Sequence, residues 1–163
     1  MKCLVGYMSK SGTTAEIAQR IGRVLEARGI EVEVKPVLTV ENIRGYDRLV
    51  LGCPVNGMNV LPEFRAYLSD KVVGSGVPLD LFIVSYLFEK GRKVFRKVIA
   101  KNREIIRNLA GASSVEVFGG RLPAPLPPFM RFVFGTPADL ALDIRDWDKI
   151  EAWAGKLAVS MKP

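Results

Sequence analysis

Histidine is absent from the 163 residues of this chain, and cysteine occurs only twice, as Cys3 and Cys53. Without histidine the chain cannot build a Ser-His-Asp triad, a Cys-His pair or a metal site with imidazole ligands. Two cysteines are too few for a disulfide framework, and a lone cysteine in or at the end of an apolar run is typically a small buried side chain. We therefore expect a reducing, cytoplasmic setting and no metal, and the sequence identifies no catalytic side chain.

Long apolar runs are missing as well. No stretch of 18 apolar residues occurs, and the short apolar run after Lys2 ends at Ser9, so we expect neither a membrane span nor a signal peptide. The chain is 48% hydrophobic and 25% charged, which is the balance of a globular domain that can bury a sizeable core. The sequence thus predicts a single domain over residues 1–163.

Acidic residues are outnumbered, and the net charge is +7. The excess is concentrated between residues 89 and 109, where only Glu89 and Glu104 oppose eight cations: Lys90, Arg92, Lys93, Arg96, Lys97, Lys101, Arg103 and Arg107. Such a balance is typical of proteins with an acidic partner. Phe95 is the single aromatic residue of this segment, which therefore lacks the interleaved aromatics that stack on bases, and it has no known nucleic-acid motif, so we do not expect nucleic acid.

Strand-like and helix-like patterns alternate along the chain. Strands are predicted at residues 2–8, 31–35, 47–52, 79–85 and 114–119, and helices between Thr13 and Gly29 and at residues 39–44, 62–71, 89–109 and 146–161. Thr13 and Glu16 have the spacing of a capping box. Five strands alternating with helices predict an α/β three-layer sandwich with a parallel sheet. Residues 120–145 break the rhythm with five prolines and form a long insert, a feature that is usually functional.

The sequence S-K-S-G-T-T directly after the first strand is the main candidate site. Its hydroxyl groups lie at Ser9, Ser11, Thr13 and Thr14, and Gly12 lets the backbone approach a ligand closely. Together with the free N–H groups of the following helix, they can bind an anion such as a phosphate. An ordinary Ser/Thr-rich turn with a helix cap is the structural alternative.

Other anion-binding loops do not match these residues. A Walker loop requires lysine after its last glycine, whereas Thr13 follows Gly12, and no G-x-G-x-x-G follows this strand. A thiol phosphatase loop requires an arginine six residues after its cysteine, which neither cysteine has. A receiver domain requires acids where Met8, Ser9 and Cys53 stand.

The motif at residues 9–14, with Y-D-R-L-V-L-G at residues 46–52, resembles the flavodoxin family over nearly the whole chain. This resemblance implies a five-stranded parallel sheet in the order 2-1-3-4-5, with FMN as the cofactor. The basic charge, the helix P-E-F-R-A-Y-L and the insert before D-W-D-K-I-E-A-W are more narrowly similar to the flavodoxin-like protoporphyrinogen oxidases, the quinone-coupled enzymes of haem biosynthesis.

The resemblance also implies the cofactor site. The phosphate of FMN would be held by Ser9, Lys10, Ser11, Gly12, Thr13 and Thr14. One side of the flavin ring would face a loop of Pro54, Val55, Asn56, Gly57, Met58 and Asn59, and the other a loop of Ser85, Tyr86, Leu87 and Phe88. Only Tyr86 or Phe88 could stack on the ring, and Asn56 and Asn59 are candidates for hydrogen bonds to its edge.

Three functions remain open on this evidence. The first is an FMN-dependent oxidoreductase that acts on an acidic substrate such as protoporphyrinogen, through cations such as Arg121 or Arg131, and passes electrons to a quinone. The second is a non-catalytic electron carrier with a redox partner, and the third is a flavin-free basic binding module. We also expect peripheral attachment to an anionic membrane surface through the basic helix and the insert's apolar residues, which are Phe129, Met130, Phe132, Val133 and Phe134.

Overall fold

The computed structural model describes residues 1–56, 59–136, 139 and 141–161. Its strands are β1 (Lys2–Tyr7), β2 (Glu31–Pro36), β3 (Arg48–Asn56), β4 (Asn59–Val60), β5 (Leu79–Val84) and β6 (Ser114–Phe118). Its helices are α1 (Thr13–Glu26), α2 (Pro62–Tyr67), α3 (Tyr86–Lys90), α4 (Lys93–Ala110), α5 (Pro128–Phe134) and α6 (Trp147–Ser160), with a 3-10 turn η1 (Val37–Thr39) and a π turn η2 (Leu68–Val72). The predicted alternation of strands and helices is confirmed.

The described residues form a six-stranded sheet whose path is β2-β1-β3-β5-β6, with β4 paired to β3 at its side. Every neighbouring pair along the path is parallel, whereas β4 runs antiparallel to β3. The parallel α/β sheet is therefore confirmed, and the predicted five-strand order matches roughly. The prediction missed β4, because a two-residue strand has too few positions to show an alternating pattern.

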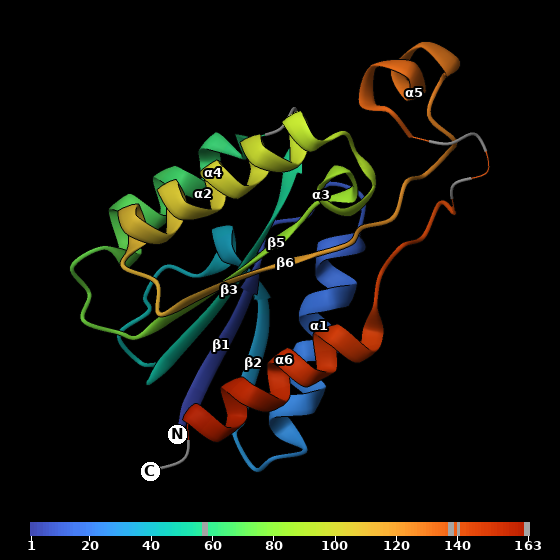
Figure 1. Ribbon diagram of the computed structural model, residues 1–163. Helices are drawn as coiled ribbons and strands as arrows, with labels where there is room; N and C mark the ends of the chain where they lie inside the picture. Colours follow the sequence, from blue (N-terminus) through green and yellow to red (C-terminus); the bar gives the residue numbers. More distant parts are fainter. Residues whose placement is uncertain (57–58, 137–138, 140, 162–163) are drawn as a thin grey trace.

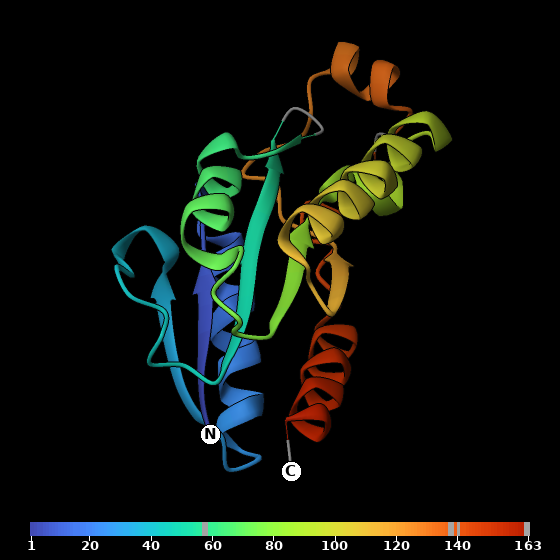
Figure 2. The same ribbon diagram turned by 90° about the vertical axis from the view of Figure 1, so that its left-hand side faces the viewer.

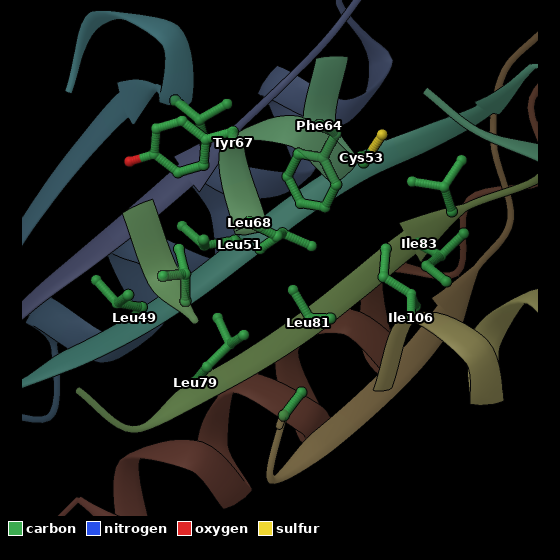
Figure 3. Close-up of a cluster of buried hydrophobic side chains, with 14 of the residues drawn as sticks. Leu49, Leu51, Cys53, Phe64, Tyr67, Leu68, Leu79, Leu81, Ile83 and Ile106 are labelled. Atoms are coloured by element: carbon green, nitrogen blue, oxygen red, sulfur yellow. The ribbon is translucent and has the colours of Figure 1, made fainter. Parts of the chain in front are cut away.

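Helices cover both faces of the sheet (Figure 1), as Figure 2 also shows from the side. The α1 and α6 helices share one core with the sheet, and Ile17, Ile21 and Ala154 are fully buried there. The second core lies under α2 and α4 and includes Leu51, Phe64 and Ile106. Figure 3 shows the side chains of α2 lying over those of β3 and β5. Burying each large apolar side chain contributes about 1.5 to 3 kcal/mol, so these two layers hold the helices in place.

Gly52 permits the closest packing in the first of these cores. A Cβ atom at this position would lie 1.9 Å from Cζ of Phe82, which is sterically impossible without moving the ring. Phe82 in turn contacts Phe118 and Trp153, with ring centroids 6.2 and 6.3 Å away. Glycine in the middle of β3 therefore makes room for an aromatic cluster that joins the sheet to α6.

Two helix predictions are wrong in their placement. No helix covers residues 39–44; the chain instead forms η1 earlier, where the Thr39 hydroxyl donates to the Pro36 carbonyl at 2.8 Å and closes the turn. The basic segment forms two helices, because Gly91 and Arg92 both have extended ψ angles, of 168° and 154°. The first of these, α3, begins at Tyr86 and so replaces part of the loop predicted at residues 85–88.

The insert leaves the sheet after β6 and returns to it before α6. At its base Arg121 and Asp143 form an antiparallel bridge, and the Leu122 N–H donates to the Leu142 carbonyl at 2.8 Å. At its tip the chain forms α5, which lies beyond the end of α4 in both views (Figures 1 and 2). The insert is thus a paired stem with a helical tip.

A polar network lies at the amino end of the sheet. Asp80 on β5 is 1% exposed and accepts hydrogen bonds from the Arg48 guanidinium of β3 at 2.6 and 2.9 Å. Its other oxygen accepts from the Ser114 hydroxyl of β6 at 2.7 Å. Both carboxylate oxygens therefore have partners within the protein, and three strands are joined.

Candidate functional site

The segment Ser9–Thr14 lies at the carboxyl end of β1, where the chain turns into α1 (Figure 1). β1 has β2 on one side and β3 on the other, so the chain crosses over in opposite directions from this strand. In open parallel sheets, ligands bind at such a switch point, beyond the carboxyl ends of the strands. The fold thus places the main candidate motif where a ligand site is expected.

Gly12 sets the backbone conformation with which the loop enters α1. This residue has φ of +85°, in the left-handed region that favours glycine, and it forms the N-cap of α1. Its N–H donates to the Ser9 hydroxyl at 3.0 Å, and the Ser11 and Thr13 hydroxyls lie 3.3 Å apart. The predicted capping box is wrong, because no side chain caps α1. Glu16 forms ion pairs with Arg121 and Arg145 instead.

The first turn of α1 offers donors without acceptors in the helix. The first intrahelical bond runs from the Glu16 N–H to the Gly12 carbonyl at 3.0 Å, so the N–H groups of Thr13, Thr14 and Ala15 precede it. Among the hydrogen bonds that the structure describes, none engages the Thr14 hydroxyl. A cluster of backbone amides and hydroxyls at a helix N-terminus suits a phosphate group, and these residues therefore fit the terminal phosphate of FMN.

A cavity of about 180 Å³ adjoins this loop. Seven of the residues predicted for the site line it together, namely Lys10, Ser11, Thr13, Thr14, Pro54, Val55 and Tyr86. Four further lining residues were not among the predicted cofactor residues: Val84, Gly120, Arg121 and Leu122. Of these, Arg121 was predicted only as a contact for an acidic substrate. The last three of the four follow β6 at the same edge of the sheet, so the rule that ligands lie beyond strand carboxyl ends could have found them.

The segment Ser85–Phe88 contributes unequally to the site. Tyr86 lines the cavity, and its hydroxyl donates to the Ala141 carbonyl of the insert at 2.6 Å, while burial raises its pKa. Phe88 packs against the second core instead, Ser85 is buried, and Leu87 accepts the Gly91 N–H at its carbonyl. Tyr86 is therefore the aromatic residue of this segment that faces the cavity.

The segment predicted as a loop at residues 54–59 is partly strand. β3 continues through Pro54, Val55 and Asn56, and Asn59 belongs to β4, which pairs antiparallel with this part of β3. Asn59 accepts a hydrogen bond at Oδ1 from Asn102 of α4 at 3.3 Å. The two remaining residues of this prediction, Gly57 and Met58, lie outside the described residues.

An ion-pair network joins the insert to the loop's helix. Glu16 in the first turn of α1 pairs with Arg121 at 2.9 Å and with Arg145, and Arg145 also pairs with Asp143 at 2.5 Å. The Arg145 side chain is only 6% exposed and stacks on Trp147, with its guanidinium carbon 4.7 Å from the ring centroid. The hydrogen bonds from Arg145 hold the pKa values of Glu16 and Asp143 below their ordinary values.

Cys53 ends the buried part of β3 close to the cavity, yet it belongs to the core (Figure 3). Burial raises the pKa of its thiol to about 12, so the reactive thiolate is scarce near neutral pH. Cys3 is buried as well, and its pKa is also raised to about 12 for the same reason. The interpretation of Cys53 as a small buried side chain is confirmed.

The sequence matches the family model described as "Flavodoxin domain" over residues 4–132. The chain belongs to the flavodoxin family. Membership of this family implies FMN as the cofactor, as the sequence motif indicated. The loop after β1, with its unpaired amides and its hydroxyls, is the part of this chain that suits the phosphate of FMN.

Solved structures support the same fold. The chain is similar to flavodoxin 1 of Bacillus cereus, with 18% identity, a TM-score of 0.63 and full coverage of both chains. It is also similar to a flavodoxin of Streptococcus pneumoniae, with 19% identity, a TM-score of 0.64, and coverage of 99% of this chain and 100% of the other. An NADH:FMN oxidoreductase in its apo form matches with 12% identity and a TM-score of 0.61, over 99% of this chain and 90% of its own. No curated protein sequence matches the chain significantly.

The narrower resemblance to protoporphyrinogen oxidases gains no support from these matches. The structures named above are flavodoxins and a flavin-dependent reductase, and at such low identity they show the fold alone. The findings therefore support a flavodoxin-family protein with FMN. They are compatible with an electron carrier at least as well as with an enzyme.

Proposed function

We propose that this protein is an electron carrier of the flavodoxin family that uses FMN and exchanges electrons with a negatively charged redox partner. The observation that carries the proposal is the Ser9–Thr14 loop, whose open amides and hydroxyls face a cavity at the switch point of the sheet. When bound, FMN supplies the electron chemistry, and the protein supplies its position and surroundings.

The residues assigned to the cofactor follow from the cavity. Ser9, Ser11, Thr13 and Thr14, with Lys10 and the backbone at Gly12, would hold the phosphate, and Pro54, Val55 and Tyr86 line the space beside it. Asn56, Asn59, Ser85, Leu87 and Phe88 remain proposals of the sequence, along with Gly57 and Met58. Of this second group, Phe88 and the Asn59 amide oxygen are already in contact with the protein interior or with α4.

The charge of the protein favours an acidic partner. Flavodoxins that are acidic attract basic partners, and a net charge of +7 reverses this attraction. Lys10 lies at the cavity itself, and Lys90, Arg92 and Lys93 follow the strand β5 that ends beside it. Complementary charge of this kind mainly raises the rate at which partners meet, and salt screens it.

A second candidate is an FMN-dependent oxidoreductase that acts on a small acidic substrate, such as protoporphyrinogen, and passes electrons to a quinone. The observation that favours it is the insert, whose residues Arg121 and Leu122 line the cavity and so could contact a substrate. Arg121 is paired with Glu16, which reduces its attraction for a substrate carboxylate. We therefore place this function second.

The absorption spectrum of the purified protein is the first test, because a flavin spectrum and release of FMN on unfolding are expected. A colourless protein that does not take up added FMN would overturn both functions and favour the flavin-free module. The reduced holoprotein is then mixed anaerobically with an acidic and a basic one-electron acceptor. We expect faster transfer to the acidic acceptor, and a rate that falls with salt.

Two charge variants sharpen this test. Lys90→Gln with Lys93→Gln should slow transfer to the acidic acceptor, whereas Arg23→Gln with Lys156→Gln removes the same charge from the α1 and α6 face and should not. Bleaching of the flavin by protoporphyrinogen under anaerobic conditions, with quinone restoring the colour, would favour the second candidate. Equal transfer rates to both acceptors would contradict the proposed charge of the partner.

A further inference from the structure

The helix α5 at the tip of the insert exposes an apolar face. Phe129 and Phe132 are 76% and 74% exposed, and Met130 and Val133 are 39% and 38% exposed. These residues occupy most of a seven-residue helix that contains no acid and a single cation, Arg131. Exposed apolar clusters of this kind mark interaction surfaces, because monomeric proteins seldom leave several large side chains together in water.

The helix is fixed to the protein from its other side. The Arg92 backbone N–H donates to the Phe134 carbonyl at 2.9 Å, and its guanidinium donates to the Phe132 carbonyl at 2.7 Å. A cation at the carboxyl end of a helix is favourable, because the carbonyl groups there are negative. The ring of Phe134 also packs edge-on against Phe95 of α4, with centroids 5.1 Å apart. These contacts fix α5 beside the start of α4, where the Phe132 ring lies 5.6 Å from the Arg92 guanidinium carbon, while Phe129 and Phe132 remain exposed.

Cations lie beside this helix on the first turns of α4. Lys93, Arg96 and Lys97 line an open groove together with Phe88, and all three are exposed. Among the side chains that the structure describes, no carboxylate pairs with them; the ion pairs of α4 involve Arg103 and Arg107 further along. In both views α5 lies beyond this end of α4 (Figures 1 and 2), and Arg92, directly before Lys93, contacts Phe132 and Phe134 of α5.

We propose that α5 and the first turns of α4 form a surface that docks this protein reversibly on an anionic phospholipid bilayer. Cations at the headgroups and shallowly buried aromatic side chains are the two features that bind a protein to such a surface. None of the described helices is both long and apolar enough to cross a bilayer, so contact would be at the surface only. The docking does not depend on electron transfer or on the proposed redox partner.

The same charges disfavour a second copy of the chain as the occupant. A symmetric dimer through α5 would bring the Lys93, Arg96 and Lys97 groups of two copies near one another. Like charges repel across an interface, and no acid on α5 would offset them. An anionic bilayer has the complementary charge and accepts the apolar side chains as well.

Cosedimentation of the holoprotein with vesicles tests the proposal. Vesicles of phosphatidylcholine alone are compared with vesicles that also contain phosphatidylglycerol, over a series of salt concentrations. We expect binding to the anionic vesicles only, and a steep loss as salt rises. Equal binding to both vesicle types, or no binding at low salt, would overturn the proposal.

Matched variants separate the two features of the surface. Phe129→Ser with Phe132→Ser should weaken binding at least about tenfold, whereas Leu38→Ser with Val159→Ser, at 66% and 65% exposure elsewhere, should leave it unchanged. Lys93→Gln with Lys97→Gln should weaken binding about tenfold, and the Arg23→Gln with Lys156→Gln control should not. All variants remain folded if their circular dichroism and FMN content match those of the unmodified protein.

Two results would assign the surface to another occupant. If Phe129→Ser with Phe132→Ser binds vesicles like the unmodified protein but converts a dimer to a monomer in light scattering, a second copy covers α5 and the proposal fails. If this variant binds vesicles normally but transfers electrons to the acidic acceptor more slowly, the surface belongs to the redox partner. The electron-transfer proposal itself would survive either result.

Discussion

The polar groups at the two ends of the sheet differ in whether they have hydrogen-bond partners within the protein. At the amino end, both carboxylate oxygens of the buried Asp80 have partners, in Arg48 and Ser114. At the carboxyl end, the N–H groups of Thr13, Thr14 and Ala15 have no acceptor within their helix, and no described hydrogen bond engages the Thr14 hydroxyl. A polar group satisfied within the protein serves stability, whereas one left open toward a cavity is available to a ligand.

The insert lies at the carboxyl end of the sheet, and its stem and its tip differ in their contacts with the rest of the protein. Its stem is joined to α1 by the Glu16 pairs with Arg121 and Arg145, while Phe129 and Phe132 of α5 at its tip are largely exposed among the described residues. The side chains of the stem therefore have partners within the protein, as those at the amino end of the sheet do. The side chains at the tip are exposed, as the loop after β1 is open to its cavity. Within the insert alone, paired side chains at the stem thus stand beside exposed side chains at the tip.

Removing Asp80 should have the largest effect on stability. Asp80→Ala leaves Arg48 buried to a large extent without its partner, and breaking a buried pair in this way costs about 3 to 5 kcal/mol. Urea unfolding should show this loss, while the FMN affinity of the folded fraction should remain unchanged. Asp80→Leu with Arg48→Met should recover most of the loss, and a cost under about 1 kcal/mol for Asp80→Ala would contradict the comparison.

Removing two hydroxyls from the loop at the carboxyl end should lower the affinity for FMN, with a smaller effect on stability than Asp80→Ala. Ser11→Ala with Thr14→Ala removes two hydrogen bonds to a charged phosphate, which contribute about 3 to 6 kcal/mol together, so FMN affinity should fall at least about a hundredfold. Titration of the apoprotein with FMN measures this, and the far variant Ser160→Ala should match the unmodified protein. Riboflavin lacks the phosphate, so its affinity should hardly change; an equal loss for both ligands would remove the phosphate from this loop.

Breaking the ion pairs between the insert and α1 should have a smaller effect on the free energy of unfolding. Glu16 is 41% exposed, so Glu16→Gln should cost only about 0.2 to 1 kcal/mol. Because the pKa of Glu16 is lowered from 4.5 in the folded protein, its contribution is present above pH 4.5 and is lost as the pH falls through the folded value. The unmodified protein should therefore lose more stability below pH 4.5 than Glu16→Gln does, as unfolding at several pH values would show.

A control for this variant exists on the same helices. Glu151 of α6 pairs with Arg20 of α1 and is 39% exposed, and this ion pair joins the two helices rather than the insert. Glu16→Gln should speed proteolysis of the insert, whereas Glu151→Gln should not. Equal cleavage rates in the two variants would show that the ion pairs do not hold the stem.

Cys53 should give the smallest effect, because it lies next to the open end but belongs to the core. With a pKa of about 12, only about one thiol in 10,000 is ionised at pH 8, and the side chain is fully buried. Iodoacetamide should therefore not label the native protein at pH 8, and it should label both cysteines in urea. Rapid labelling of Cys53 in the native protein would place it at the site.

Much of the fold follows from short-range patterns. The buried strands read as apolar runs, and α1 reads as an amphipathic helix because Ile17, Ile21 and Leu25 repeat at helical spacing. The helix α3 and the strand β4 could not be predicted, because five and two residues are too few to show a period. The break at Gly91 and Arg92 was equally hidden among residues that favour a continuous helix.

The sequence by itself determined the candidate phosphate loop, because Ser9, Gly12 and Thr14 lie within six consecutive residues and this loop needs no distant segment to form. Only the tertiary structure decided what faces that loop. Tyr86 reaches the cavity and Phe88 does not, because α3 turns one side chain toward the insert and the other into the core. Arg121 and Arg145 meet Glu16 across 105 and 129 residues, and no local pattern specifies contacts at such separation, since they depend on how the packed layers bring chain segments together.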